Sequence, residues 1–570
     1  MKFIKKNKNV FLLFILFLYI LINNNGIYCL NNKINGDLNI ENDNSNIVNK
    51  DLNYSNIENS INSLIINLLE KELSIDNFVE LRERVELHTW LWREIFGDGP
   101  YDNDTFKKSS FIYQNSKYLT GHYKILATLH QKLYPWLYRS RFYSFNNLFN
   151  SFNGQGIVIY TSNKNFKNAL STVDTLRNII NTNLPIEIFY IGDNLSEENQ
   201  KKFLEYSNVY ISDITKYFDN NLLNIKEWSV KPFAILASRF KEVILIDADT
   251  IYIRDPSILF EGEGYKETGT VFFRDRTLFP GPNSGSEWIK TWMVNSFPET
   301  ERLHFRNEET FYEMESSTIV INKGKVLLGL LAVCKYNEHQ IRNEVIYTKI
   351  HEDKETFWMG FDMAREHYNE ISLPRIFIGE ILIGTKGNPN TKQLWGHQGH
   401  MGPDGKILFW NDHIVKNKNI DEYKNHLLKF DGYVIENSKI NWVNSEYMNI
   451  NNQRVFSLSE EEKSIINQII NRKYEIQSNI SEIHENRNEL NVNIEEIINN
   501  NYNKMNFIDF IETDNGNKKI IERKAHNFDK NILYISRHNG TISNFNNIAY
   551  KLSFNITAYQ PTVCKCKYKL

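Results

Sequence analysis

The chain has 570 residues, of which 41% are hydrophobic, 13% aromatic and 24% charged. This composition can bury a large core, so a wholly disordered chain is excluded, and the length corresponds to about three or four domains. The 66 basic and 69 acidic residues give a formal net charge of −3, which does not indicate nucleic acid as a partner. Four cysteines are too few for a disulfide-based scaffold.

The first thirty residues predict export. Four lysines within residues 2–8 precede an unbroken apolar run from Val10 to Ile22. A helix over this run is roughly 20 Å long, shorter than the roughly 30 Å hydrocarbon core, which is typical of a signal peptide. No small-residue cleavage site follows, so a type II membrane anchor is the second interpretation. Asn-x-Ser/Thr sequons agree with lumenal exposure, at Asn53, Asn103, Asn194, Asn479, Asn539 and Asn555.

Composition and periodicity divide the next part of the chain. Residues 31–60 are polar and asparagine-rich, which predicts a stem. Over residues 61–150 the apolar side chains recur at helical spacing, for example at Leu87, Leu91 and Ile95, so we expect a helical pre-domain.

From residue 151 to 445 short apolar strands alternate with helices. Strands are predicted at 157–160, 186–191, 209–211, 243–246, 270–273 and 318–321, and helices at 166–180, from 196, at 232–240 and at 354–368. Strands that are apolar on both faces and alternate with helices indicate a mainly parallel sheet covered by helices on both faces. We therefore predict an α/β fold here. Residues 446–570 are asparagine-rich again and are expected to form an extension of unknown role.

The predicted strand 243–246 runs directly into the acidic motif Asp247-Ala-Asp249. Ligands of open parallel sheets bind beyond the carboxyl ends of the strands, and carboxylate oxygens suit Mg²⁺ or Mn²⁺. Such a metal would neutralise a departing nucleoside diphosphate. A solvated loop pair is the alternative, and an EF-hand is excluded because Tyr252 stands where that loop needs glycine. A second Asp-x-Asp, at residues 102–104, lies in a polar turn and is given no chemistry.

Six collinear segments carry a resemblance to a known family. The first two segments are GIVIY from Gly156, with LR at 176–177 and LPIE at 184–187, and WSVKPFAILASRFKEVILIDAD from Trp228. The other four are FFRDR from Phe272, ESSTIVI from Glu315, DKETFWMGF from Asp353 and HMGPDGK from His400. Together they resemble the Golgi alpha-mannosyltransferases of fungi, glycosyltransferase family 71, over about residues 156–406. The resemblance implies a GT-A type nucleotide-diphospho-sugar transferase fold. It also implies a retaining, metal-dependent enzyme that transfers alpha-mannose from GDP-mannose to a glycan acceptor on glycoproteins.

The resemblance also implies a metal site and a donor site. By position, Asp247 and Asp249 would hold Mn²⁺ (or Mg²⁺), with Asp249 the more direct ligand and Asp247 shared with the ribose. His400 matches a late histidine that completes the metal and diphosphate site in many such folds, and His397 is its rival. The donor-binding candidates are Arg177, Lys231, Asp247, Asp275, Arg276 and Glu315. For the cations and for Asp275 a surface charge or an internal ion pair is the alternative.

Retention of configuration requires a carboxylate nucleophile or same-face attack guided by the leaving phosphate. Asp353 is assigned to acceptor or sugar contacts, and Glu355 to a nucleophilic or donor-stabilising role, with helix N-terminal acids as the alternative. Trp358 and Trp395 are candidates for stacking on sugars, with core packing as the alternative. Ser317 departs from the family, in which glycine is common at that position.

Two other functions stay open from the sequence. The same fold could use another nucleotide sugar, such as UDP-galactose or UDP-glucose, or the chain could be a non-catalytic lumenal sugar-binding protein. The expected partners are GDP-mannose, a mannose-containing glycan acceptor and a membrane reached through the N-terminal segment. The expected location is the Golgi membrane with a lumenal catalytic domain, with secretion or the ER lumen as alternatives.

Overall fold

A computed structural model describes residues 69–101, 117–369, 375–384, 391–411, 414, 427–436, 447–451 and 453–477, and four short strands beyond residue 507. From Glu72 onward the chain forms one compact unit, separate from Met1–Lys71. Among the described residues no helix is both long and apolar enough to cross a bilayer. The predicted export segment Val10–Ile22, the whole predicted stem and five of the six sequons lie outside the described residues.

The helical segment before the sheet contains α3 (Phe78–Phe96), α5 (Lys117–Leu133) and α6 (Phe145–Asn150). The side chain of Asn77 caps the start of α3 by accepting a hydrogen bond from the backbone N–H of Glu80. Helix α3 packs on α5 and is also tied to the following domain, because Arg82 Nη1 lies 3.1 Å from Asp362 Oδ1. The helical segment therefore packs directly on the α/β core.

The central sheet has six strands in the order β3-β2-β1-β4-β7-β6. Their bounds are β1 Gln155–Tyr160, β2 Ile186–Tyr190, β3 Val209–Asp213, β4 Glu242–Ile246, β6 Thr270–Arg274 and β7 Met314–Asn322. The first four strands pair in parallel, while β7 is antiparallel to both of its neighbours. The order changes direction between β1 and β4, which makes the crevice at their carboxyl ends the expected ligand site.

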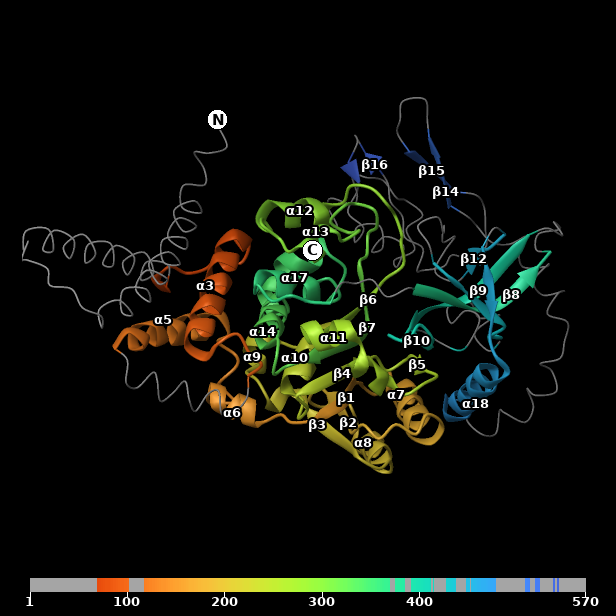
Figure 1. Cartoon of the computed structure of the whole chain (residues 1–570), viewed down its shortest axis with the longest axis horizontal. Helices are drawn as coiled ribbons and strands as arrows, with labels where there is room; N and C mark the ends of the chain where they lie inside the picture. The colour runs from red at the N-terminus through yellow and green to blue at the C-terminus, as the bar shows by residue number, and fades with distance from the viewer. Residues whose placement is uncertain are drawn as a thin grey trace, which may run out of the picture. The chain divides into compact units, whose positions relative to one another are not determined.

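Helices cover both faces of this sheet, as the composition of its strands requires (Figure 1). One face carries α7 (Phe166–Asp174), the π-helix η1 (Thr175–Ile179) and α8 (Glu197–Leu204), and the other carries α10 (Val230–Ala237), α14 (Leu327–Tyr336) and α17 (Thr356–Met363). Helices α14 and α17 approach closely at Gly360, where an added Cβ would lie 2.6 Å from Val333 Cγ2. The predicted α/β class, mainly parallel with helices on both faces, is confirmed.

A second sheet of antiparallel strands follows the motif Asp247-Ala-Asp249. Its order is β13-β11-β8-β9-β10-β5, with β12 paired to β9. The bounds are β5 Thr250–Tyr252, β8 Arg375–Ile383, β9 Lys392–Met401, β10 Ile407–Asn411, β11 Gly432–Ile435, β12 Tyr447–Asn449 and β13 Val455–Ser457. Strand β5 starts directly after Asp249 and pairs with β10, which pairs with β9. This connection brings residues near position 400 to the end of β4.

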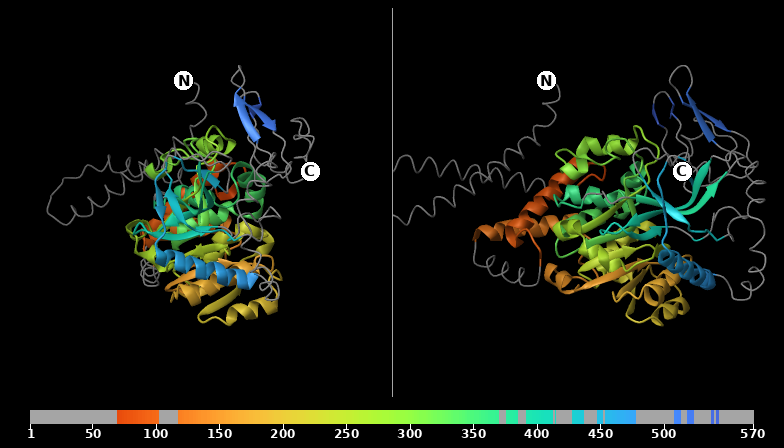
Figure 2. Two further views of the ribbon diagram at one scale, coloured as in Figure 1. Left: turned by 90° about the vertical axis from the view of Figure 1, so that its right-hand side faces the viewer. Right: turned by 45° about the vertical axis from the view of Figure 1, so that its right-hand side comes forward.

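The remaining helices and strands complete the described chain. The helices are η2 Ile214–Lys216, α9 Asn220–Leu223, η3 Glu227–Ser229, η4 Pro256–Glu261, α11 Glu263–Thr268, α12 Ser284–Trp292, α13 Pro298–Glu301, α15 His339–Ile341, η5 Arg342–Ile346, α16 Tyr347–Lys349 and α18 Glu460–Gln477. Helix α18 packs on α7 (Figure 2). Arg472 Nε on α18 lies 2.9 Å from Asp174 Oδ2 on α7. Two hairpins follow: β14 Ile508–Glu512 with β15 Lys518–Glu522, and β16 Arg537–His538 with β17 Thr541–Ile542.

Candidate active site

The acidic motif lies at the carboxyl end of β4, as the sequence predicted. The Asp247 N–H donates to Ser317 O at 2.8 Å, which continues the β4–β7 pairing. The carbonyl of Ala248 accepts a 2.8 Å hydrogen bond from Thr172 Oγ1 on α7. These bonds fix the turn between β4 and β5, so both carboxylates start from a rigid backbone at the edge where the β1–β4 crevice opens. The side chain of Asp247 is 28% exposed, and Asp249 is half-buried.

Lys231 on α10 is the cation next to this motif. Its buried ammonium donates to Asp247 Oδ2 at 2.9 Å and to the carbonyl and hydroxyl oxygens of Ser316 at 3.0 Å each, and it lies 4.0 Å from Asp353 Oδ2. Burial opposes its charge, but the carboxylates of Asp247 and Asp353 outweigh burial and raise the pKa of Lys231. Burial and the neighbouring Asp249 carboxylate raise the pKa of Asp247 to about 6, against the opposing effect of Lys231. Lys231 thus stays charged and neutralises part of the acidic cluster.

Asp353, before α17, is the buried carboxylate opposite Lys231. It is 1% exposed, and its Oδ2 has no hydrogen-bond partner among the described residues. Burial raises its pKa, partly offset by Lys231. Buried polar atoms are normally hydrogen-bonded, so this oxygen is available to a bound group.

Glu315 and His400 lie side by side under the motif. Glu315 accepts hydrogen bonds from Ser317 N at 2.8 Å and Ser317 Oγ at 2.6 Å, and from Asn411 Nδ2 at 3.2 Å. Burial and the Asp275 and Asp247 carboxylates raise the pKa of Glu315 to about 7, although the bonds from Ser317 oppose this. His400 Nε2 lies 3.7 Å from Glu315 Oε2.

His400 is fully buried on β9, where its ring contacts the rings of Phe273 and Phe409, each with centroids 4.9 Å away. Burial, with the charge of Arg375, lowers its pKa to about 3, so the ring is neutral and can act as a ligand. Its Nδ1 has no hydrogen-bond partner in the described part of the chain. Strand β9 pairs with β8 without interruption over these positions, so His397 faces the opposite side of the sheet from His400. Of the two rivals, the structure therefore brings His400 toward Glu315.

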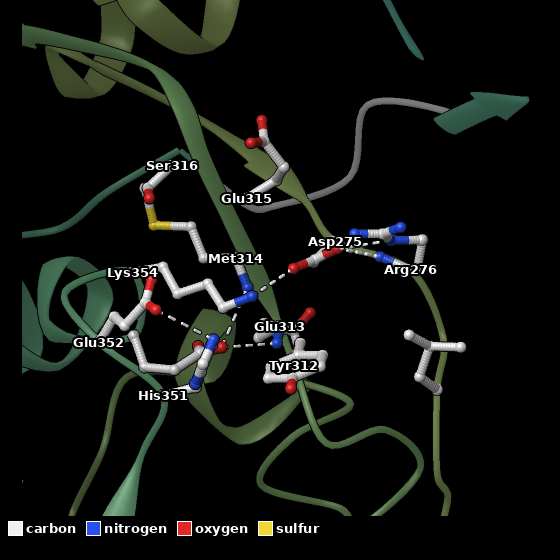
Figure 3. A network of polar contacts seen from close by, with 12 residues as sticks. Asp275, Arg276, Tyr312, Glu313, Met314, Glu315, Ser316, His351, Glu352 and Lys354 are labelled. Carbon is white, nitrogen blue, oxygen red and sulfur yellow. Dashed lines mark hydrogen bonds and ion pairs between the residues drawn. The ribbon is translucent and has the colours of Figure 1, made fainter. Parts of the chain in front are cut away.

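A second polar cluster lies at the end of β6 (Figure 3). Lys354 Nζ lies 2.6 Å from Asp275 Oδ2 and 3.8 Å from the centre of the Tyr312 ring. The backbone N–H of Arg276 donates to Asp275 Oδ1 at 2.7 Å. Burial would raise the pKa of Asp275, but Lys354 and Arg276 outweigh it and hold that pKa well below its usual range. Asp275 is thus an ionised carboxylate paired with Lys354 and Arg276. This is the internal ion pair that the sequence analysis gave as the alternative to donor binding.

Glu355 takes a different place from the one predicted. It is fully buried, Oε1 accepts from Glu313 N at 2.8 Å, and Oε2 accepts from Trp358 Nε1 at 2.6 Å. Burial raises its pKa to about 7, although the bond from Trp358 opposes this. Both oxygens are therefore used to hold the start of β7 against α17, and this arrangement is a correction to the proposed nucleophile.

Arg177 is also corrected. Its guanidinium donates to four backbone carbonyls, those of Thr182, Leu184, Ser207 and Asn208, at 2.7 to 3.3 Å. These carbonyls precede β2 and β3, at the amino ends of the strands. Because the acidic motif lies at the carboxyl ends, Arg177 is at the far edge of the sheet and supports the backbone there. The sugar-stacking candidates Trp358 and Trp395 are 0% and 8% exposed and belong to the core.

The metal site is not preformed as a tight cluster. Within the described ranges, no three His, Cys, Asp or Glu side chains gather closely enough to hold an ion. The donor set still suits a hard divalent cation, because it combines two strand-end carboxylates with a neutral imidazole whose Nδ1 makes no hydrogen bond to the described residues.

Lys354 and Ser316 were missed from the sequence. Both stand inside segments that carried the resemblance, between residues that were assigned roles. The available signal for Lys354 was a single cation between two acids, Asp353 and Glu355. Ser316 contributes its backbone carbonyl as well as its hydroxyl, and a backbone contact leaves no mark in a residue pattern.

Comparison with known proteins adds to this geometry. Residues 154–394 match the family model described as "Mannosyltransferase putative". The Candida albicans protein named "Putative alpha-1,3-mannosyltransferase MNN14" is 27% identical over 366 residues, 55% of this chain and 51% of that protein. Alpha-1,3-mannosyltransferase MNN1 of Saccharomyces cerevisiae is 24% identical over 313 residues, 45% of this chain and 40% of that protein. The chain thus spans about half the length, or less, of these relatives.

Among solved structures, core-mannan synthase A of Aspergillus fumigatus in its Mn/GDP form aligns with a TM-score of 0.25 at 10% identity, over 38% of this chain and 70% of that one. The mannosyltransferase Ktr4p of S. cerevisiae aligns with a TM-score of 0.25 at 12% identity, over 37% and 66%.

The mainly parallel sheet with an acidic motif at the end of β4, together with the family match, defines an α/β domain whose expected ligand site is the crevice at the carboxyl ends of β1 and β4. Over residues 154–394 the chain is similar to the mannosyltransferase family whose model it matches. The resemblance to the fungal alpha-mannosyltransferases is confirmed.

Proposed function

We propose that this protein is a retaining alpha-mannosyltransferase that transfers mannose from GDP-mannose to a mannose-containing glycan on glycoproteins. The observation that carries the proposal is the acidic motif Asp247-Ala-Asp249 at the β1–β4 crevice, within the segment that matches a mannosyltransferase family. The names of the relatives MNN14 and MNN1 support an alpha-1,3 linkage.

Asp247, Asp249 and His400 would hold Mn²⁺ (or Mg²⁺), with the donor diphosphate as a further ligand. The ion would neutralise the negative charge that builds on the departing GDP. The need for a donor ligand agrees with the open arrangement of the three residues, since no closed ion site exists among the described side chains.

The cations of the site have distinct roles. Lys231 balances Asp247 and Asp353, so that the acidic cluster does not repel a diphosphate. Lys354 is fixed by Asp275 and by the Tyr312 ring and presents a second positive charge beside the end of β6, next to Arg276. Glu315, on β7, would accept a hydrogen bond from a sugar hydroxyl, whereas Asp275 would hold Lys354 and Arg276 in position.

Asp353 is the carboxylate that we place against the transferred sugar. Its Oδ2 is buried and makes no hydrogen bond to the described residues, whereas both oxygens of Glu355 are occupied. Asp353 would contact the donor or acceptor sugar, and Glu355 would position it by holding β7 against α17. Attack from the face that the phosphate leaves would retain the alpha configuration without a protein nucleophile.

The apolar run after the N-terminal lysines supports a location in the secretory pathway, with a Golgi membrane anchor as the specific proposal. A glycan acceptor on glycoproteins agrees with that compartment.

Thermal stabilisation tests the proposed donor and metal together. The full chain is heated with GDP-mannose, UDP-galactose or UDP-glucose, with and without Mn²⁺, as wild type, Asp249→Ala and the matched control Asp104→Ala from the second Asp-x-Asp. We expect GDP-mannose with Mn²⁺ to raise the melting temperature of wild type and control, since saturation at about 100 times the Kd adds about 2.7 kcal/mol. Equal shifts in Asp249→Ala would refute the metal site. Stabilisation by the UDP-sugars alone would refute the donor.

A further inference from the structure

The segment Lys226–Ser229 presents an exposed tryptophan at the entrance to α10. The short helix η3, Glu227–Ser229, runs directly into α10. Trp228 is 44% exposed and is the one exposed tryptophan within the described ranges. Its indole makes neither a ring contact nor a hydrogen bond with the part of the chain that the structure describes. The position opens the family segment that ends at Asp249, yet nothing above gives it a role.

The backbone of this segment is strained and firmly held. Glu227 has φ +47°, in the left-handed region that is costly for a residue with a long side chain. Arg342 donates to the carbonyls of Leu223 at 2.9 Å and Asn224 at 2.5 Å, and Ile225 is buried. Ser229 Oγ donates to Lys226 O at 2.7 Å and accepts from Lys226 N at 3.1 Å. Strained backbone that is held in place by neighbouring hydrogen bonds is often found at ligand-binding sites.

The segment lies at the same crevice as the acidic motif. Lys231, which bonds Asp247 at the end of β4, is three residues after Trp228, about one helical turn along. Burial raises the pKa of Tyr160, the last residue of β1. A hydrogen bond with Asn194 lowers that pKa, and the negative charge of Glu227 raises it further. Burial and then the Asp353 carboxylate are the main causes that raise the pKa of Tyr347, and Glu227 contributes there as well. The short helix η3, which contains Glu227, packs on α10, and α10 packs on β1 and β4, so Glu227 lies on the helix that borders the β1–β4 crevice.

We propose that Trp228 and Glu227 bind the nucleobase of the donor, with the indole stacked on the ring and the carboxylate accepting hydrogen bonds from the base edge. This inference rests on the proposed function and deepens it. Guanine offers two adjacent donors, N1–H and N2–H, which match the two oxygens of one carboxylate. Uracil offers a single N–H between two carbonyl oxygens, which a carboxylate repels. Glu227 is thus the residue that selects GDP over UDP, while stacking on Trp228 serves any base.

Calorimetric binding of GDP and UDP to the full chain with Mn²⁺ separates the two roles. Glu227→Gln should weaken GDP by roughly 10- to 100-fold, the usual range for hydrogen bonds to a charged group. The same variant should bind UDP at least as tightly as wild type, because the carboxylate that repels the uracil oxygens is gone. Trp228→Ala should weaken both nucleotides alike, by roughly tenfold or more, and Trp228→Phe should recover most of the loss. Glu461→Gln, an exposed glutamate on α18, is the matched control and should bind like wild type.

Each remaining outcome decides a separate question. If Glu227→Gln and Trp228→Ala bind GDP like wild type while Asp249→Ala does not, the base lies elsewhere and the proposed function stands. If Glu227→Gln weakens GDP and UDP equally, the carboxylate does not read the base, and the guanine assignment is overturned. If the wild type binds neither nucleotide, the proposed function itself fails.

Discussion

Replacing Lys231 tests whether Lys231, Asp247 and Asp353 form a buried cluster of charges that stabilises the fold. Lys231 is 4% exposed, and its ammonium lies 2.9 Å from Asp247 Oδ2 and 4.0 Å from Asp353 Oδ2. At an effective dielectric constant of about 20, these separations correspond to attractions of about 6 and 4 kcal/mol. Burial of the three charges cancels much of this. Replacement by methionine removes the cation and leaves two carboxylates facing each other, one of them without a hydrogen bond at Oδ2. Breaking a buried ion pair in this way costs about 3–5 kcal/mol.

Urea denaturation, followed by tryptophan fluorescence at pH 7 in the absence of metal, measures this cost. Lys231→Met should unfold at a clearly lower urea concentration than wild type, and adding Asp353→Asn should recover part of the loss because the opposing charge is then gone. Lys266→Met is the matched control, because Lys266 forms an exposed pair with Glu261 at 3.0 Å and should change stability by less than about 1 kcal/mol. If Lys231→Met is as stable as Lys266→Met, or if the second substitution adds a further loss, the three residues do not form a buried charge triad.

Three further predictions concern residues that the structure placed outside the chemistry. Glu355→Ala should lower the free energy of unfolding by about 2–4 kcal/mol, because it leaves Glu313 N and Trp358 Nε1 buried without acceptors. Glu355→Gln should retain transfer activity. Loss of activity with unchanged stability in Glu355→Gln would restore a nucleophilic role for Glu355. Arg177→Ala should lower the unfolding midpoint and leave the KM for the donor unchanged, and a raised KM would return Arg177 to the donor site. His88 Nε2 lies 2.8 Å from His130 Nδ1, and burial lowers the pKa of His88 to about 3, below the unfolded value of about 6.5. The unfolded state then binds more protons, so stability should fall as the pH drops below about 6.5, by up to about 1.4 kcal/mol per unit per histidine. His88→Phe should flatten this profile and His339→Phe should not.

The strands of the central sheet could be predicted from the local sequence pattern. Each strand that was predicted at 157–160, 186–191, 209–211, 243–246, 270–273 and 318–321 coincides with one of the six strands of the sheet. Apolar runs bounded by turn residues specify such strands regardless of what they pair with. Strand β7 starts earlier than expected, at Met314, because the polar residues Glu315, Ser316 and Ser317 are inside a strand that lines the site.

The strand pairing of the second sheet could not be predicted from the local sequence pattern. Strand β5 is three residues long, and its pairing with β10 joins residues about 160 positions apart. Nothing local in the sequence encodes that partner, yet this pairing is what carries His400 to the acidic motif. The motif itself was predictable because it directly follows a buried strand.

The roles of single charged residues depended on three-dimensional contacts. Arg177 and Lys231 are both cations on helices next to the sheet, and the sequence treats them alike. One lies at the amino ends of the strands and the other at the carboxyl ends, which only the packing of η1 and α10 decides. Asp353 and Glu355 are two residues apart, and the positions of Trp358 and Glu313 determine which carboxylate is occupied.

The most direct measurement of the central claim is product analysis. The full chain is incubated with GDP-mannose, Mn²⁺ and methyl alpha-mannoside, and the products are identified by NMR. The proposed function predicts an alpha-linked dimannoside that is formed by wild type and by Asp104→Ala but not by Asp249→Ala. A beta-linked product would contradict retention. No dimannoside from a folded wild-type chain, or equal yield from Asp249→Ala, would contradict the assignment of the carboxyl end of β4 as a mannosyl-transfer site.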